Sequence, residues 1–170
     1  MVWSDDIVES LRANDIWLVP YVPDAVGWQV VSKLEKDPAF RTVPTSREEE
    51  AVAIAAGAYA AQKRAAVFVQ SSGFGNTINS LAQLAIAHRI PVPIFVGMRG
   101  GLGEFNPVQV PSAQPIPKIL DAMNVQHYAP EREDEVAKVV DGAIELAFAS
   151  RYPVAVLLYS SLVGAKKRAT

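Results

Sequence analysis

Short apolar runs separated by longer amphipathic stretches set the pattern of this chain. Runs of strand length occur at Trp17–Val19, Arg41–Val43, Ala66–Gln70, Val92–Gly97, Gln126–Tyr128 and Val154–Tyr159. The longer runs are continuously apolar rather than alternating, which is typical of strands that are buried on both faces of a parallel sheet.

Helical periodicity fills the stretches between these runs. We expect helices at Ser4–Asn14, Val26–Lys36, Arg47–Lys63, Asn76–His88, Pro115–Met123 and Glu131–Ser150, with a Gly- and Pro-rich loop over 98–114. The order of the elements predicts an α/β fold, a three-layer sandwich with about six mostly parallel strands and right-handed crossovers. The length of 170 residues, with no low-complexity linker, suits one domain over residues 1–170.

Composition narrows the class of protein. The net charge is −2, so no basic surface favours nucleic acid or an anionic membrane. The chain has no cysteine, which excludes disulfides and thiolate chemistry. Neither histidine has a partner at metal-ligand spacing, so we expect no metal site made by this chain alone. The apolar runs are too short to span a bilayer and the start is acidic, which favours a cytoplasmic protein. The basic tail, Gly164–Thr170, is expected to be a solvated end.

Ligands gather beyond the carboxyl ends of the strands in such sheets. Three candidate segments follow predicted strands: Thr45–Glu50, Ser71–Asn76 and Met98–Gly103. In the first, Ser46 is a natural N-cap and Glu49 completes a capping box. The helix that follows, over 51–61, has almost only small side chains, and Gly57 at its centre costs about 1 kcal/mol relative to alanine. Small side chains let another helix or chain approach closely, which favours an interface.

The other two segments offer different chemistry. Gln70-Ser-Ser-Gly-Phe-Gly-Asn76 places glycines between a strand and a helix, where backbone N–H groups can meet a phosphate or a polar ring edge. It lacks the third glycine of the dinucleotide fingerprint, so a plain tight turn is equally compatible. Arg99 is a lone cation in a glycine-rich loop, where it could clamp a carboxylate, phosphonate or sulfonate.

Together these motifs resemble a known family. Ser46-Arg-Glu-Glu-Glu-Ala-Val-Ala-Ile-Ala-Ala-Gly-Ala-Tyr59, the loop from Gln70 to Asn79 and Met98-Arg-Gly100 are similar to the α subunits of the sulfopyruvate decarboxylases. They are also similar to the N-terminal part of the phosphonopyruvate decarboxylases. The resemblance implies the pyrimidine-binding domain of a thiamine-diphosphate enzyme, a carboxy-lyase that converts 3-sulfopyruvate to sulfoacetaldehyde and CO2.

The resemblance also implies roles for particular residues. A glutamate at the start of a small-residue helix hydrogen-bonds N1′ of the aminopyrimidine and so activates the cofactor. An alignment on Gly57 selects Glu48, whereas an alignment on Tyr59 selects Glu49. We prefer Glu48 because the capping box already explains Glu49. The resemblance places the loop after Gln70 beside the pyrimidine, and the residues expected to bind the cofactor are Ser72, Gly73, Phe74, Gly75 and Asn76. It places Arg99 beside the substrate, and the residues expected to bind the substrate are Arg99 and Gln70.

Half of such a site is missing from the sequence. In this family a GDG…NN motif holds the diphosphate through Mg2+, and this chain has neither GDG nor an Asn-Asn pair. We therefore expect a separate β subunit to carry that motif, in a hetero-oligomer that is active only when assembled. Three alternatives stay open: decarboxylation of phosphonopyruvate or another 3-substituted pyruvate, a flavodoxin-like module that binds a nucleotide, and a non-catalytic subunit.

Overall fold

The computed structural model describes residues 2–163, so the basic tail lies outside the described residues. Its centre is one seven-stranded sheet in which every recorded pairing is parallel. The strands are β1 (Ile16–Tyr21), β2 (Arg41–Pro44), β3 (Arg64–Ala65), β4 (Val67–Gln70), β5 (Pro93–Met98), β6 (Gln126–Tyr128) and β7 (Val154–Tyr159). The spatial order is β2-β1-β4-β5-β7-β6, and the two-residue β3 also pairs with β1. The predicted parallel α/β fold is confirmed, with one short strand more than expected.

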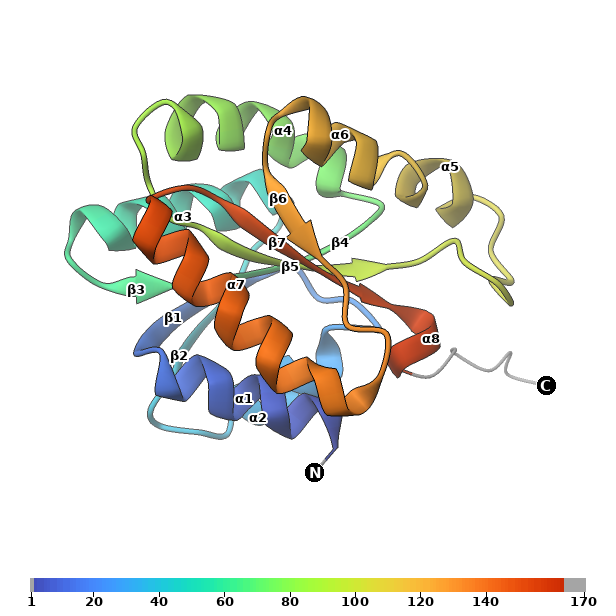
Figure 1. The fold of residues 1–170 in the computed structure, drawn as a ribbon, viewed down its shortest axis with the longest axis horizontal. Coiled ribbons are helices and arrows are strands. Elements are labelled where there is room, and N and C mark those ends of the chain that lie inside the picture. Colours follow the sequence, from blue (N-terminus) through green and yellow to red (C-terminus); the bar gives the residue numbers. More distant parts are fainter. Residues whose placement is uncertain (1, 164–170) are drawn as a thin grey trace.

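Helices cover both faces of this sheet (Figure 1). One face carries α1 (Trp3–Ala13), α2 (Trp28–Leu34) and α7 (Val136–Ser150), whose apolar sides share one core with the strands. The other face carries α3 (Glu48–Ala60), α4 (Thr77–Ser80) with its π-helical continuation Leu81–Ile86, α5 (Gln109–Ala113) and α6 (Ile116–Ala122). Shorter elements are the 3₁₀ turns Phe74–Asn76 and Glu133–Glu135 and the helix α8 (Ser160–Val163).

Several predicted boundaries were wrong. The stretch 98–114 is not entirely loop, because it contains α5. The expected helix over 76–88 is divided into 3₁₀, α and π segments. Helix α3 ends at Ala60 instead of Lys63, because Gln62 adopts a left-handed φ of 60°. The amides of Gln62 and Lys63 then bond to the carbonyls of Tyr59 and Ala58, which is the Schellman pattern that closes a helix.

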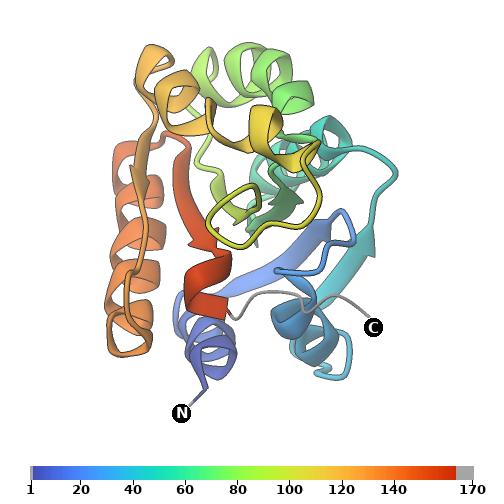
Figure 2. The same ribbon diagram turned by 90° about the vertical axis from the view of Figure 1, so that its right-hand side faces the viewer.

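The sheet brings the ends of β1, β4 and β5 together. Tyr21 of β1 is in register with Phe68 of β4, and Gln70 of β4 is in register with Gly97 of β5. Because all these strands run in the same direction, the segments that follow them emerge at one edge of the sheet. Figure 2 faces this edge, with the yellow-green loop after β5 running across it.

Candidate functional site

Glu48 is buried where α3 begins. Arg47, in an extended conformation, precedes the helix, and Glu48 is its first residue. The Glu48 side chain lies against the loop after β4, and the residue is only 6% exposed. A Cβ on Gly73 would stand 1.8 Å from Oε1 and 2.1 Å from Oε2 of Glu48. The carboxylate therefore occupies the space that any other residue at position 73 would need.

The neighbouring glutamates lie in different environments. The predicted capping box between Ser46 and Glu49 is wrong, because the helix begins one residue later than that pattern requires. The Glu50 carboxylate instead accepts a hydrogen bond from the Ser46 amide at 2.9 Å. Glu49 pairs with Arg47 at 2.6 Å, and its side chain is 34% exposed. Of the three carboxylates, only that of Glu48 belongs to a buried residue.

The predicted loop from Gln70 to Asn76 folds on itself. The amides of Gly73, Phe74 and Asn76 donate to carbonyls within the loop, at 3.2, 3.3 and 2.9 Å. These three N–H groups are thus already satisfied and are not presented to a phosphate. The Phe74 ring is completely buried in the core between the sheet and the α3 layer. The remaining predicted residues of this loop differ in exposure: Ser72, Gly75 and Asn76 are exposed, Gly73 is buried and Gln70 is half-buried.

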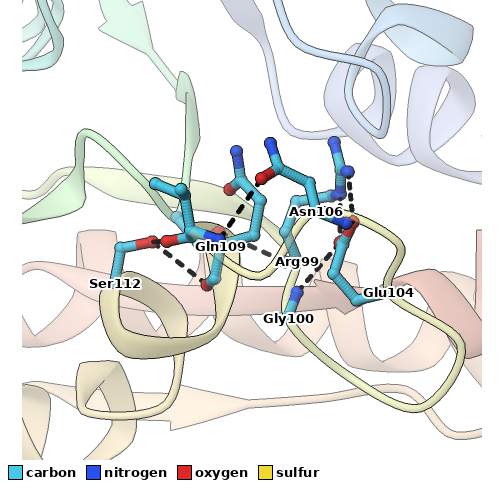
Figure 3. A network of polar contacts seen from close by, with 8 residues as sticks. Arg99, Gly100, Glu104, Asn106, Gln109 and Ser112 are labelled. Carbon is cyan, nitrogen blue, oxygen red and sulfur yellow. Dashed lines mark hydrogen bonds and ion pairs between the residues drawn. The ribbon is translucent and has the colours of Figure 1, made fainter.

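Arg99 is not the lone cation that the sequence suggested. Its Nε and Nη2 donate to the two carboxylate oxygens of Glu104, each at 2.7 Å (Figure 3). Both side chains are largely buried, with 13% and 6% exposed. The guanidinium and two backbone amides lower the pKa of Glu104 to about 2. The Arg99 amide also donates to Ser71 Oγ at 3.1 Å, which ties the loop after β5 to the loop after β4.

Asp24 also lies at this edge of the sheet, although the sequence did not single it out. It follows β1 by three residues, and its carboxylate lies against the backbone of Gly97 in β5. Burial raises its pKa most; the Val26 and Gly27 amides and Arg99 lower it, and the charge of Glu48 raises it further. The available signal was an aspartate after a proline with a glycine three residues on, which reads as an ordinary turn.

The donor set fits one end of thiamine diphosphate. The buried Glu48 carboxylate accepts no hydrogen bond from the described residues, so it can bond to a ring nitrogen of the cofactor. The GDG…NN motif that would hold the diphosphate is absent from the sequence. Within residues 2–163, no group of three His, Cys, Asp or Glu side chains could hold a metal ion. No helix in the same range is long and apolar enough to cross a membrane.

Comparisons with known proteins identify the family of this chain. Residues 1–100 match the family model "Thiamine pyrophosphate enzyme, N-terminal TPP binding domain". The chain is 36% identical over 151 residues to sulfopyruvate decarboxylase subunit alpha of Methanocaldococcus jannaschii, covering 89% of each chain. It is 32% identical over 155 residues to the same subunit of Methanococcus maripaludis, covering 91% of this chain and 93% of the relative.

A relative with a shorter match is the phosphonopyruvate decarboxylase of Streptomyces viridochromogenes. The identity is 33% over 104 residues, which are 61% of this chain and 26% of that protein. The match to the sulfopyruvate decarboxylase subunits, in contrast, extends over nearly the whole chain. This chain therefore belongs to the thiamine pyrophosphate enzymes, as an N-terminal TPP-binding domain of the sulfopyruvate decarboxylase subunit alpha type.

Proposed function

We propose that this chain is the pyrimidine-binding subunit of a decarboxylase that converts 3-sulfopyruvate to sulfoacetaldehyde and CO2. The observation that carries the proposal is the buried carboxylate of Glu48, held against Gly73 at the carboxyl edge of the sheet. The substrate is taken from the names of the relatives that match about nine-tenths of the chain.

Glu48 is assigned the activation of the cofactor. When bound, thiamine diphosphate would supply the electron sink for the electron pair that stays on the 2-oxo carbon when the carboxylate group leaves as CO2. The Glu48 carboxylate shares a proton with N1′ of the aminopyrimidine, and its burial keeps water from competing for that proton. Gly73 fixes its position, because the carboxylate fills the volume beside the glycine Cα. The buried environment favours Glu48 over Glu49, which is engaged with Arg47.

The loop between β4 and α4 is assigned to the surroundings of the pyrimidine. Gly73 lies beside the Glu48 carboxylate, and Ser72, Gly75 and Asn76 of the same loop are exposed. Phe74 supports the loop from within the core, so its contribution is to hold the loop rather than to contact the ring. Arg99 and Gln70 are assigned to the substrate side of the site. An anionic substrate group can bind Arg99 through Nη1, which makes no recorded hydrogen bond to the described residues, or by displacing Glu104.

The diphosphate and its Mg2+ are assigned to a separate β subunit with a GDG…NN motif, in a cytoplasmic hetero-oligomer. The outward face of α3 suits such a partner, because Ala53, Gly57 and Ala60 are exposed and small. A hollow beside this face is lined by residues of α3 and of the segment from Asn76 to Ser80. Small side chains on an exposed helix allow another backbone to approach closely.

Reconstitution tests the proposal directly. The purified chain is mixed with the candidate β subunit, thiamine diphosphate and Mg2+, and CO2 release is measured with 3-sulfopyruvate, phosphonopyruvate and pyruvate. We expect turnover only when both chains are present, with the highest kcat/KM for 3-sulfopyruvate. Full turnover by this chain alone would contradict the divided site. A higher kcat/KM for phosphonopyruvate would identify phosphonopyruvate as the substrate, which is the candidate that the resemblance to the Streptomyces enzyme favours.

The nucleotide-binding alternative is less well supported. A flavodoxin-like module would use the amides of the glycine loop for a phosphate, yet three of those amides are bonded within the loop. It also gives no account of a buried carboxylate at the start of α3. Tight binding of a flavin or nucleotide by the purified chain would revive this alternative.

A further inference from the structure

Gln109 carries a side-chain amide that the chain leaves unpaired. The residue begins α5, in the stretch that follows β5, and it is half-buried. Its Oε1 is buried without a hydrogen-bond partner, and its Nε2 makes no hydrogen bond to the residues that the structure describes. Buried polar atoms nearly always have a partner, because an unpaired one has lost its bonds to water and gained nothing in return. This amide is therefore suited to bind a ligand.

Asn106 and Arg99 present nitrogen atoms on the same side of the loop. The Oδ1 of Asn106 accepts a hydrogen bond from the Val108 amide at 3.2 Å, which fixes the orientation of its side-chain amide and leaves Nδ2 unpaired. On Arg99, Nε and Nη2 donate to Glu104, so Nη1 is the nitrogen that remains. Figure 3 shows the end nitrogens of Gln109, Asn106 and Arg99 projecting to one side. These three side chains together offer only N–H donors there.

The loop that carries these donors is held in a fixed conformation. The Glu104 carboxylate accepts hydrogen bonds from the amides of Gly100 at 3.1 Å and Asn106 at 3.0 Å, besides its two bonds to Arg99. Gly100 packs so closely on the start of α5 that a Cβ there would stand 2.6 Å from the Gln109 carbonyl oxygen. A ligand would thus meet donors that are already in position, which lowers the entropic cost of binding.

The donor set suits a singly charged anion. Glu104 balances the charge of Arg99, so the cluster attracts a ligand through hydrogen bonds rather than through net positive charge. The oxygens of an ionised sulfonate or phosphonate accept hydrogen bonds and match such donors. A sulfonate keeps one negative charge near neutral pH, whereas a phosphorus oxyanion there gains a second charge or retains a proton. A set of donors without net charge therefore favours the sulfonate.

The reaction decides which anionic group of the substrate binds to these donors. The substrate carboxylate must leave as uncharged CO2, so strong hydrogen bonds to it would stabilise the ground state alone. The 3-substituent keeps its charge throughout, and bonds to it hold the substrate without opposing the chemistry. The Arg99 amide joins this loop, through Ser71, to the loop that seats Glu48. We propose that Gln109 and Asn106, with Arg99, bind the sulfonate of 3-sulfopyruvate and set the selectivity for the 3-substituent. This inference rests on the proposed function.

Replacing Gln109 by methionine separates binding from folding. Gln109→Met keeps an unbranched side chain of similar size and removes the unpaired buried oxygen, so the Tm of the chain should equal or exceed that of the wild type. In the assembled enzyme with thiamine diphosphate and Mg2+, kcat/KM for 3-sulfopyruvate should fall by at least about tenfold, the loss expected for one hydrogen bond to a charged group. The matched control is Gln114→Met, at an exposed glutamine just after α5, which should stay within about twofold of the wild type.

Asn106→Asp is a second, independent variant. It keeps the acceptor for the Val108 amide and replaces the N–H donors by a negative charge, so kcat/KM for 3-sulfopyruvate should fall by at least about 100-fold. The value for pyruvate, which has no anionic 3-substituent, should change by less than about threefold. The inhibition constant of 3-sulfopropanoate, an analogue that cannot be decarboxylated, should rise in both variants by the same factors as kcat/KM falls.

The outcomes distinguish this inference from the function on which it rests. If Gln109→Met and Asn106→Asp match the Gln114→Met control in kcat/KM and in the inhibition constant, the inference is overturned and the proposed function stands. Equal losses for pyruvate and 3-sulfopyruvate, or a loss confined to phosphonopyruvate, would also overturn it. No turnover of any 3-substituted pyruvate by the wild-type pair would overturn the proposed function itself.

Discussion

The contact between Glu48 and Gly73 makes a sharp prediction for Gly73→Ala. The backbone at Gly73 has φ −105° and ψ −5°, which alanine adopts without strain, so the effect of the substitution is purely steric. The new Cβ would stand 1.8 Å from Oε1 of Glu48, whereas ordinary contacts begin at 3.4 Å. The carboxylate must therefore move by roughly 1.5 Å.

The size of this displacement sets the expected loss. A misplacement of about 1 Å in a catalytic group costs on the order of 100-fold in rate. We expect kcat of the assembled Gly73→Ala enzyme to fall by at least about 100-fold, with destabilisation of about 1–3 kcal/mol from overpacking. Stopped assays of CO2 release and urea unfolding of the chain measure the two effects.

A double-mutant cycle isolates the cause. In a Glu48→Ala background the carboxylate is absent, so adding Gly73→Ala should cost less than about 0.5 kcal/mol of stability. The difference between the two backgrounds is the coupling energy between the positions. If Gly73→Ala keeps kcat within about threefold of the wild type and the two costs in stability are equal, the proposed seating of Glu48 is refuted.

Two further predictions concern the partner and the ion pair. Gly57→Leu should abolish assembly with the β subunit. It should not unfold the chain, because a Cβ at position 57 meets nothing within 4 Å. The control Gly142→Leu on α7 is equally unobstructed and should assemble normally, as size-exclusion chromatography will show. Equal assembly of both variants would exclude the outer face of α3 as the interface. The Arg99–Glu104 pair stabilises the chain above the ordinary glutamate pKa of 4.5, and this stability is lost as the pH falls from there towards about 2. Glu104→Gln should therefore lower stability at pH 7 by roughly 1.5–3 kcal/mol and remove that part of the acid dependence, which urea titrations across this range will detect; an unchanged acid profile would contradict it.

Continuous apolar runs were enough to predict six of the seven strands, all but β3. The strands at Val92–Gly97 and Val154–Tyr159 were found within one residue because they are fully buried on both faces, and burial leaves a continuous apolar run in the sequence. Helix α5 was missed because its five residues lie in a Gly- and Pro-rich stretch with too few turns to show a period. The three candidate segments that follow strands also lie together in the structure, because parallel strands end at one edge of the sheet.

Pairings that depend on loop conformation could not be predicted. Glu104 reaches Arg99 because Gly100 and Gly103 adopt φ values of 74° and 82°, which turn the loop back on itself. Nothing in the order of residues reveals that turn. Asp24 escaped notice for a related reason, since its neighbours Gly97 and Arg99 are distant in sequence and adjacent only across the sheet.

The role of Glu48 is the central claim, and the most direct test is Glu48→Gln in the assembled enzyme. Glutamine keeps the shape of the side chain beside Gly73 but cannot exchange a proton with the cofactor ring. We predict an unchanged Tm, normal assembly and a loss of decarboxylation of at least about 100-fold, while Glu49→Gln stays within a few-fold of the wild type. Near-normal turnover in Glu48→Gln, with Glu49→Gln inactive, would contradict the account and transfer the role to Glu49.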